Sequence, residues 1–537
     1  MSQTKAQLIA SDATFTISSD ASFNSVTVGK GANSVAGNTV LGETALDASV
    51  SGADNTAIGK NALTTLTSGT ANTALGMQSL QLATEGNFNV AVGKEALKDL
   101  TTGSSNIAVG LEAAANLTTA SNITAIGHQA LSTITTAANN TAVGRHVLKN
   151  TTSGSGNTGM GVNALDANTT GSNNVGLSVD ALGANTTGDQ NIGIGAFSLD
   201  ANTTANNNIA IGYASLSGNT TGTSNVGIGS AALFNNTTAD SNTALGYESL
   251  KANTTGTELV AVGYQALNSN TTANSNTAIG FKSLAENTIG FRNTGLGAYS
   301  GDAITTGDQN THLGYTAGTS QTTGDDNTSV GHGAMFATTT ASDNTAVGSL
   351  ALHANTTGHS NVALGAQALE NNTTANYNVA VGLHALHDNS TGERCNAFGA
   401  DALGSNTTAN NNNAFGYNAL LSNTTGASNN AFGKSCLDAN TTGNSNTGIG
   451  HNALGDNTTG SDNTAIGCNA LDANTSASNN TAVGRSALLS NTTGHSNVAV
   501  GALALDANTT GHSNTGVGYL SLSGETTGVR NTALGFH

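Results

Sequence analysis

Residues 202–218 read NTTANNNIAIGYASLSG, and nearly the whole chain consists of copies of this 17-residue unit. We number the unit so that Asn202 is position 1 and Gly212 is position 11. A short unit cannot bury its own apolar side and must stack on its neighbours to do so. A fixed period of this length therefore predicts a solenoid.

The register of the repeat is kept without interruption. Position 11 recurs at 30 points between residues 42 and 535, and each of them is Gly except Ser178. No insertion shifts this register. We therefore predict one repeat region over residues 32–537 and a separate cap or attachment segment over residues 1–31.

The secondary structure within the unit is expected to be β. Five-residue runs such as NTAIG and NVAVG are rich in β-branched residues and bounded by Gly and Asn, and no window keeps a helical apolar spacing. Residues 25–29, SVTVG, look like a strand of the same type. The predicted fold is all-β: a β-solenoid of about thirty coils at ~4.8 Å per coil, on the order of 140 Å long.

Several positions predict ladders of identical side chains. Position 10 is apolar in every copy, position 15 is mostly Leu, and position 7 is Asn in 27 of 30 copies. Stacked amides can donate to one neighbour and accept from the other, which satisfies a buried polar group. Asn355, at position 1, is expected to be exposed. The predicted structural ladder is represented by Asn208, Asn225, Asn276, Asn310, Ile211, Gly212 and Leu216.

The pattern of the strand also bears on assembly. Positions 8 and 10 are expected to point to the same side and share a core, because Asn396, Asn413 and Asn430 at position 8 accompany Phe at position 10. Recent duplication of one unit would explain the same pairing. Apolar residues on both sides of so thin a coil imply a second buried surface, and we expect a parallel homotrimer.

Composition and charge exclude several classes of function. The 537 residues include no Pro and no Trp, only 9% are charged, and the net charge of −18 is spread without acidic or basic runs. The absence of a basic stripe argues against nucleic-acid binding. No stretch is long enough for membrane insertion, and residues 1–20 have no secretory-signal pattern. Since the sequence stops within a unit, we expect a tip domain to follow or a partner to cover that end.

The sequence offers no motif for catalysis or for a cofactor. Cys395, Cys436 and Cys468 occupy different positions of their units, so they form neither a disulfide framework nor a metal site. His495 and His512 share position 5 and should lie ~4.8 Å apart, as solvated turn residues rather than metal ligands. His384 and His387 are interpreted in the same way. An enzyme is not expected.

Exposed aromatic residues provide one candidate for ligand contact. Tyr residues recur at position 12, directly after the repeated Gly, and are expected to be exposed, although isolated exposed tyrosines are common. The candidate glycan contacts are Tyr213, Tyr247, Tyr264, Tyr417 and Tyr519.

This repeat resembles the repeats of two protein families. The runs NTAIGKNAL at 55–63 and SVTVGKGANSVAGNTVLG at 25–42 look like the head repeats of trimeric autotransporter adhesins, but the unit length differs and no anchor or signal is found. The 17-residue unit with its NTTG turn, and the opening MSQTKAQLI, more closely resemble tail-fibre and appendage proteins of marine bacteriophages. The resemblance implies a trimeric virion fibre for host attachment, bound to other virion proteins through its N-terminal segment. Many such fibres also carry a C-terminal chaperone domain, and the sequence departs from them in showing none.

An ice-binding solenoid is the alternative. Paired Thr residues at positions 2 and 3, such as Thr203 and Thr204, repeat along the chain. Adjacent side chains of a strand point to opposite sides, whereas an ice-binding array needs both hydroxyls on one side. The NTTG context favours turn residues instead.

Overall fold

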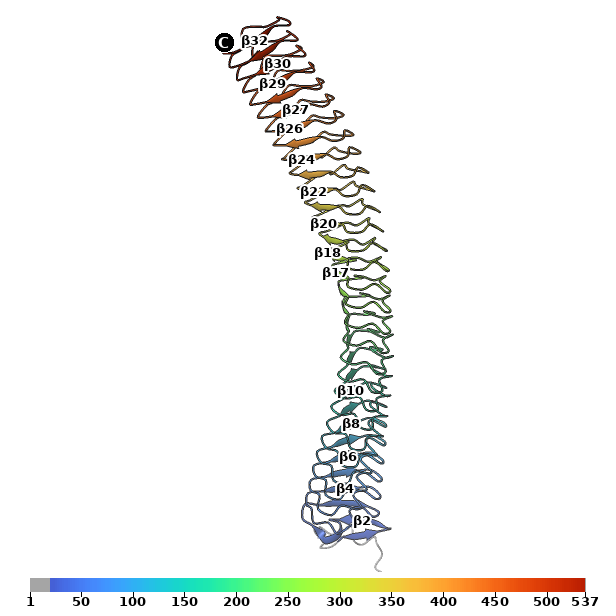
Figure 1. The fold of residues 1–537 in the computed structure, drawn as a ribbon. Helices are drawn as coiled ribbons and strands as arrows, with labels where there is room; N and C mark the ends of the chain where they lie inside the picture. Colours follow the sequence, from blue (N-terminus) through green and yellow to red (C-terminus); the bar gives the residue numbers. More distant parts are fainter. Residues whose placement is uncertain (1–19, 537) are drawn as a thin grey trace, which may run out of the picture. The chain divides into compact units, whose positions relative to one another are not determined.

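The computed structural model describes residues 20–536 and confirms the all-β solenoid with its 17-residue repeat. It comprises two units, which we call the N-terminal unit (described from residue 20 to 242) and the C-terminal unit (residues 243–536). Figure 1 shows that within each unit the coils stack one on the next, with one short strand per coil.

The N-terminal unit begins with two antiparallel pairs. Strand β1 (Ala21–Phe23) pairs with β2 (Val26–Gly29), and β2 pairs antiparallel with β3 (Thr39–Gly42); the short 3-10 helix η2 (Ala32–Ser34) lies between β2 and β3. Strand β2 therefore differs in direction from the repeat strands, contrary to the expectation that residues 25–29 form a strand of the same type. The edge of β3, the first repeat strand, is therefore paired with β2 rather than left open.

From β3 onward the strands of this unit are parallel and in strict register. Ile209, Ala210 and Ile211 of β13, for example, face Val226, Gly227 and Ile228 of β14. The strands after β3 are β4 (Thr56–Ile58), β5 (Thr73–Leu75), β6 (Val90–Val92), β7 (Ile107–Val109), β8 (Thr124–Ile126), β9 (Thr141–Val143), β10 (Thr158–Met160), β11 (Val175–Leu177), β12 (Ile192–Ile194), β13 (Ile209–Ile211) and β14 (Val226–Ile228).

The C-terminal unit repeats the same parallel arrangement. Its strands are β15 (Thr243–Leu245), β16 (Val260–Val262), β17 (Thr277–Ile279), β18 (Thr294–Leu296), β19 (Thr311–Leu313), β20 (Thr328–Val330), β21 (Thr345–Val347), β22 (Val362–Leu364), β23 (Val379–Val381), β24 (Asn396–Phe398), β25 (Asn413–Phe415), β26 (Asn430–Phe432), β27 (Thr447–Ile449), β28 (Thr464–Ile466), β29 (Thr481–Val483), β30 (Val498–Val500), β31 (Thr515–Val517) and β32 (Thr532–Leu534).

The interior of each coil is narrow. Ala210 at position 9, Ser215 at position 14 and Leu216 at position 15 are buried, whereas Ile209 and Ile211 at positions 8 and 10 are partly exposed. Positions 8 and 10 do share a side, but it is the outer one, so the prediction that they share a core within one chain is wrong. The inward Leu side chains fill the coil, which leaves space only for small residues at position 9.

Positions 6, 11, 13 and 15 of the unit have positive φ torsions, as Asn207, Gly212, Ala214 and Leu216 show. Gly212 has φ +132°, and a Cβ built on it would lie 2.6 Å from the carbonyl oxygen of Gly229 in the next coil. This close approach explains Gly at position 11. Leu216 has φ 51°, an arrangement that costs roughly 1–2 kcal/mol for an L-residue. Full burial of a leucine side chain offsets about the same amount.

The position-7 asparagines form a buried spine, although not by the predicted amide-to-amide contact alone. Asn208 Nδ2 donates to the Gly222 carbonyl at 2.9 Å, and its Oδ1 accepts from the backbone N–H of Asn225 at 2.9 Å. Asn276 and Asn310 make equivalent bonds to the main chain of the next coil. Each spine amide therefore ties its own coil to the backbone of the following one.

A second buried ladder runs through position 1. Asn202 Nδ2 donates to Asn185 Oδ1 at 2.8 Å, and Asn372 Nδ2 donates to Asn355 Oδ1 at 2.9 Å. The prediction that Asn355 is exposed is therefore wrong: this residue is fully buried. The turn folds inward at its first residue, because the amide also donates to the carbonyl three residues ahead, at Gly358.

Candidate binding surfaces

The tyrosines at position 12 lie on the surface, but their surroundings differ. Their exposed fractions range from 42% to 61%. Tyr213 packs edge-on against Phe197, and Tyr519 stacks on Phe536, so each of these two tyrosines contacts a neighbouring ring. Tyr247 and Tyr264 instead belong to a longer row, while Tyr417 lies in the coil that follows a non-aromatic Ala400 at the same position.

An aromatic row crosses six successive coils of the C-terminal unit. Its first three rings stack nearly parallel, with centroids 5.3 Å apart between Tyr247 and Tyr264 and 5.1 Å apart between Tyr264 and Phe281. It continues through edge contacts at Tyr299 and ends with a stacked pair. The full row comprises Tyr247, Tyr264, Phe281, Tyr299, Tyr315 and His332.

This packing limits what the row can bind. A sugar ring packs on an aromatic face, but the faces of Tyr264 are covered by Tyr247 on one side and Phe281 on the other. The stacked rings thus present mainly edges and hydroxyl groups to solvent. Tyr264 is consequently a poor glycan platform, contrary to what its exposure alone indicates.

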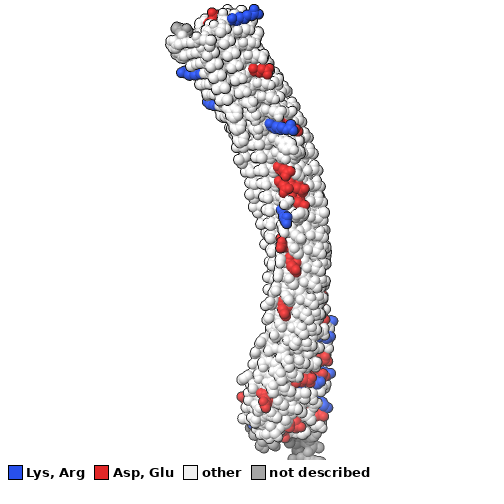
Figure 2. Space-filling model, viewed as in Figure 1, with Lys and Arg blue, Asp and Glu red and all other residues white. Residues whose placement is uncertain are grey.

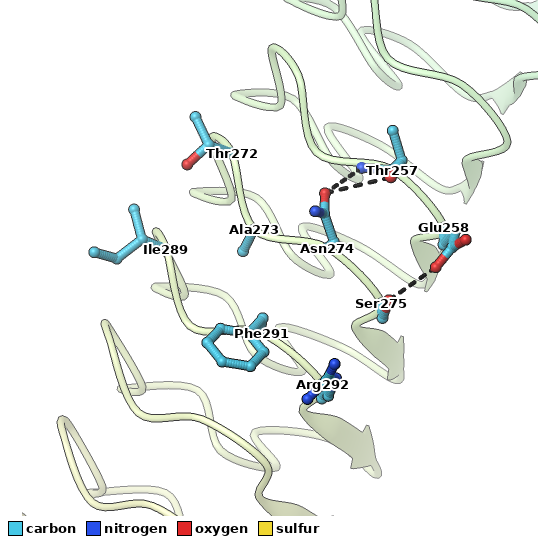
Figure 3. Close-up of a pocket in the computed structure, with 9 residues that line it drawn as sticks. All are labelled: Thr257, Glu258, Thr272, Ala273, Asn274, Ser275, Ile289, Phe291 and Arg292. Carbon is cyan, nitrogen blue, oxygen red and sulfur yellow. Dashed lines mark hydrogen bonds between the residues drawn. The ribbon is translucent and has the colours of Figure 1, made fainter.

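A groove lies at the opposite end of the strands, where residues 3–6 of the unit form the outer turn. It has a volume of about 400 Å³ and lies between the turn that contains Asn274 and the turn that contains Phe291 (Figure 3). Ile289 and Phe291 project from the lower turn in that view, with exposed fractions of 55% and 38%. These two apolar side chains form one wall of the groove.

Polar and charged groups complete the groove. The Arg292 guanidinium lies over the Phe291 ring, 5.3 Å from its centroid. On the other side, Glu258 accepts a hydrogen bond from the Ser275 hydroxyl at 2.9 Å, and Asn274 Oδ1 accepts from the Thr257 backbone N–H at 2.8 Å. The groove therefore combines an aromatic ring, a cation, a carboxylate and several hydroxyl groups.

The outer strand face, formed by positions 8 and 10, is a third surface. None of its residues is charged in any of the 30 copies of the unit. Many side chains on it are more than a third exposed, including Leu75, Met160, Leu245, Leu296 and Leu364. Charged groups are also sparse on the side that Figure 2 shows. An uncharged, partly apolar face of this extent is typical of an interface.

Within this face, three coils carry two additional ladders. Phe398, Phe415 and Phe432 stack with centroids 4.7 Å apart. Beside them, Asn396 Nδ2 donates to Asn413 Oδ1 at 2.7 Å, and Asn413 continues to Asn430 at 2.8 Å. The three coils that have Asn at position 8 and Phe at position 10 therefore carry two parallel rows. The amides hydrogen-bond from coil to coil, and the rings stack from coil to coil.

The two histidine pairs make different contacts, and the spacing predicted for His495 and His512 is confirmed. His495 and His512 do stack, with centroids 4.7 Å apart. His384 bonds to Asp401 and Gln367, and its ring lies 5.3 Å from that of His387. Among residues 20–536, no group of three or more His, Cys, Asp or Glu is arranged to hold a metal ion.

The cysteines are all free thiols. Burial raises the pKa of Cys395 to about 11 and that of Cys436 to about 12, so both are protonated and unreactive at neutral pH. Cys468 is exposed.

The threonines of the NTTG turn lie in bends, and their hydroxyls are not equivalent. Thr203 Oγ1 donates to the carbonyl of Thr220 at 3.2 Å, and the same bond recurs in many coils, whereas Thr204 is exposed. Since position 2 uses its hydroxyl within the stack, positions 2 and 3 do not present two matching hydroxyl rows.

The fold defines the class of protein as a β-solenoid. No family model matches the chain, and no curated protein is significantly similar to it. Between residues 20 and 536 no helix has the length and apolar character required to cross a bilayer.

Proposed function

We propose that this protein is a structural fibre of a virion, acting as spacer and adhesin in host-cell attachment, and that it works as a parallel homotrimer. The observation that carries the proposal is the uncharged outer strand face. In a chain in which 9% of residues are charged, none of the sixty residues at positions 8 and 10 of the 30 copies is charged. A face that must stay in water has no reason to exclude charge so completely.

The area of this face fits a stable interface. In the C-terminal unit alone it extends over 18 strands, which at ~4.8 Å per strand and roughly 10 Å of width amounts to about 850 Å². A stable interface buries about 800 Å² per partner. Identical units in strict register let identical rows meet around a three-fold axis.

Oligomeric state tests the proposal directly. We expect light scattering to give three times the chain mass of 52.8 kDa. Leu364→Lys introduces a charge on the strand face and should dissociate the trimer. Leu383→Lys is the matched control, because Leu383 is equally exposed (48% against 47%) but lies at position 12, outside that face.

A stable monomer at micromolar concentration would overturn the homotrimer. It would leave the Thr and aliphatic rows of the strand face in water, and a thermal-hysteresis measurement would then test ice binding. The attachment role needs a separate test: antibody against the chain should label an appendage of the virion, and particles that assemble without the chain should bind host cells poorly. Particles that bind equally well without it would contradict the role.

A further inference from the structure

The groove over residues 257–292 is a local departure from the repeat. Position 3 is Thr in most copies, but it is Ile289 here, and Phe291 and Arg292 follow at positions 5 and 6. The preceding coil has the smaller Thr272, Asn274 and Ser275 at the same positions. The step from small to large side chains between two neighbouring turns creates the hollow in Figure 3.

The cation in this groove is available to a ligand. Arg292 lies over the Phe291 ring, and within residues 20–536 no carboxylate lies within ion-pair distance of its guanidinium. A guanidinium stacked on a ring keeps its N–H donors in the plane, directed away from the ring. Carboxylates bind these donors in a two-point arrangement.

The remaining lining suits a ring-shaped polyol. Phe291 and Ile289 offer an apolar wall to the C–H groups of a sugar ring. Glu258 and the hydroxyl oxygens of Thr257 and Ser275 offer acceptors for sugar hydroxyl groups, while the two hydroxyl protons are donated to Asn274 and Glu258.

The backbone argues against a peptide as the ligand. The N–H of Ser275 donates to the carbonyl of Thr257, and the N–H of Arg292 donates to that of Asn274. The N–H of Phe291 is held by the Asp308 carboxylate at 2.9 Å. Because these main-chain groups bond along the stack, the groove offers no free strand edge to an extended peptide.

We infer that this groove is a binding site for a saccharide that carries a carboxylate group, with Arg292 holding the carboxylate and Phe291 packing on the sugar ring. The inference deepens the proposed attachment role and rests on it for its biological meaning. The lining residues lie at positions 3–6, so the groove shares no residue with the strand face at positions 8 and 10.

Calorimetric titration of the full-length chain with trigalacturonate tests the inference, with neutral maltotriose as the comparison ligand. Since the groove is open and shallow, we expect a Kd for trigalacturonate on the order of 1 mM and weaker binding of maltotriose. Binding of trigalacturonate should weaken as salt rises, because salt screens the guanidinium–carboxylate attraction.

The variants separate the two contacts. Arg292→Gln should raise the Kd for trigalacturonate about tenfold. Phe291→Thr should weaken binding of both saccharides. Arg394→Gln is the matched control, because Arg394 also occupies position 6 and lies over a ring, that of Tyr377 at 5.9 Å, but is outside the groove. This control should bind trigalacturonate like the unmodified chain.

The inference would be overturned by no saturable binding of trigalacturonate to the folded chain, by equal affinity for maltotriose, or by an equal loss of affinity in Arg394→Gln. Triglutamate bound as tightly as trigalacturonate would show that the site recognises the carboxylate without the sugar, and would overturn the saccharide assignment. Light scattering on the same samples reports the trimer independently. Failure of the groove and failure of the proposed fibre are therefore distinguishable.

Discussion

The imidazole of His312 occupies the space that a side chain at Gly318 would need. His312 is at position 9, where nearly all other coils have a small residue, while Gly301 and Gly318 are at position 15, where most other coils have Leu. A Cβ on Gly301 would lie 2.8 Å from His312 Cδ2, and a Cβ on Gly318 would come closer still to the ring. One buried imidazole thus replaces two leucine side chains in the core.

This relationship predicts strong coupling between the two positions. Gly318→Leu alone should lower the free energy of unfolding by at least about 3 kcal/mol, because the new side chain clashes with the buried ring. His312→Ala alone should cost about 2–4 kcal/mol by leaving a cavity. The two together restore the usual Ala and Leu, so the double variant should be more stable than either single one. Urea unfolding of the four proteins measures this cycle, and additive effects would contradict the packing.

His312 also predicts acid sensitivity. Burial lowers the pKa of His312 from 6.5 to about 4, its Nδ1 bonds to Ser329 Oγ at 2.7 Å, and its Nε2 has no hydrogen-bond partner among the described residues. Between pH 6.5 and 4 the unfolded chain binds a proton at this residue and the folded chain does not. Stability from His312 is therefore complete above pH 6.5 and falls by up to about 3 kcal/mol toward pH 4.

The pH dependence of urea unfolding measures this effect against a suitable reference. The double variant His312→Ala, Gly318→Leu lacks the imidazole and should lose less stability between pH 6.5 and 4 than the unmodified chain does. An equal loss in both proteins would assign the acid sensitivity to other groups.

Ser178 is the one register point that is not Gly, and its φ of 115° is unfavourable for a residue with a side chain. Its main chain lies against Gly161 of the preceding coil. We expect Ser178→Gly to raise the free energy of unfolding by about 1 kcal/mol or more through relief of backbone strain. The reverse change, Gly212→Ser, should lower it. Thermal unfolding checks both, and a destabilised Ser178→Gly variant would show that the hydroxyl matters more than the strain.

The repeat made the fold predictable, because a period of 17 residues with Gly212 and Asn208 in fixed places leaves few ways to stack. The orientation of the strand was not predictable. Ile209 and Ile211 alternate with Ala210, and either set satisfies strand alternation. The choice depends on Leu216, whose buried side chain fills the interior of the coil and leaves space for the small Ala210.

The binding surfaces were predictable only in part. Position 12 identified Tyr247 and Tyr264, and the same register holds Phe281 directly after them, which a search restricted to tyrosine missed. Tyr299 was harder to foresee, because it lies at position 13 rather than position 12. The groove depends on a size difference between neighbouring coils, which appears only when Phe291 is placed beside Asn274.

The two asparagine ladders should both contribute to stability, but unequally. Asn310→Leu leaves the buried backbone N–H of Asn327 without its acceptor, while the carbonyl of Gly324 keeps the donor from Gln321. Asn355→Leu orphans no group: the carbonyl of Gly358 still accepts from Asn344, and Asn372 Nδ2 still donates to the carbonyl of Ala375. An unsatisfied buried group costs about 1–3 kcal/mol. We expect a loss of about 1–3 kcal/mol for Asn310→Leu, from the one unsatisfied N–H, and a smaller loss for Asn355→Leu.

Thermal and urea unfolding measure both ladder variants. Thr357→Ala, in the exposed part of the same turn as Asn355, is the control and should change stability by less than about 0.5 kcal/mol. Losses no greater than that of Thr357→Ala would refute the spine.

The rows on the outer strand face predict coupling along the stack rather than across the strand. Phe415 contacts Phe398 and Phe432, and Asn413 bonds to Asn396 and Asn430. A double-mutant cycle between Phe398→Val and Phe415→Val should give a coupling of about 0.5–1.5 kcal/mol, the usual value for an aromatic pair. A cycle between Asn413→Thr and Phe415→Val should be nearly additive, because each side chain bonds within its own row. Strong coupling in the second cycle and none in the first would mean that positions 8 and 10 pack on each other, as the sequence alone indicated.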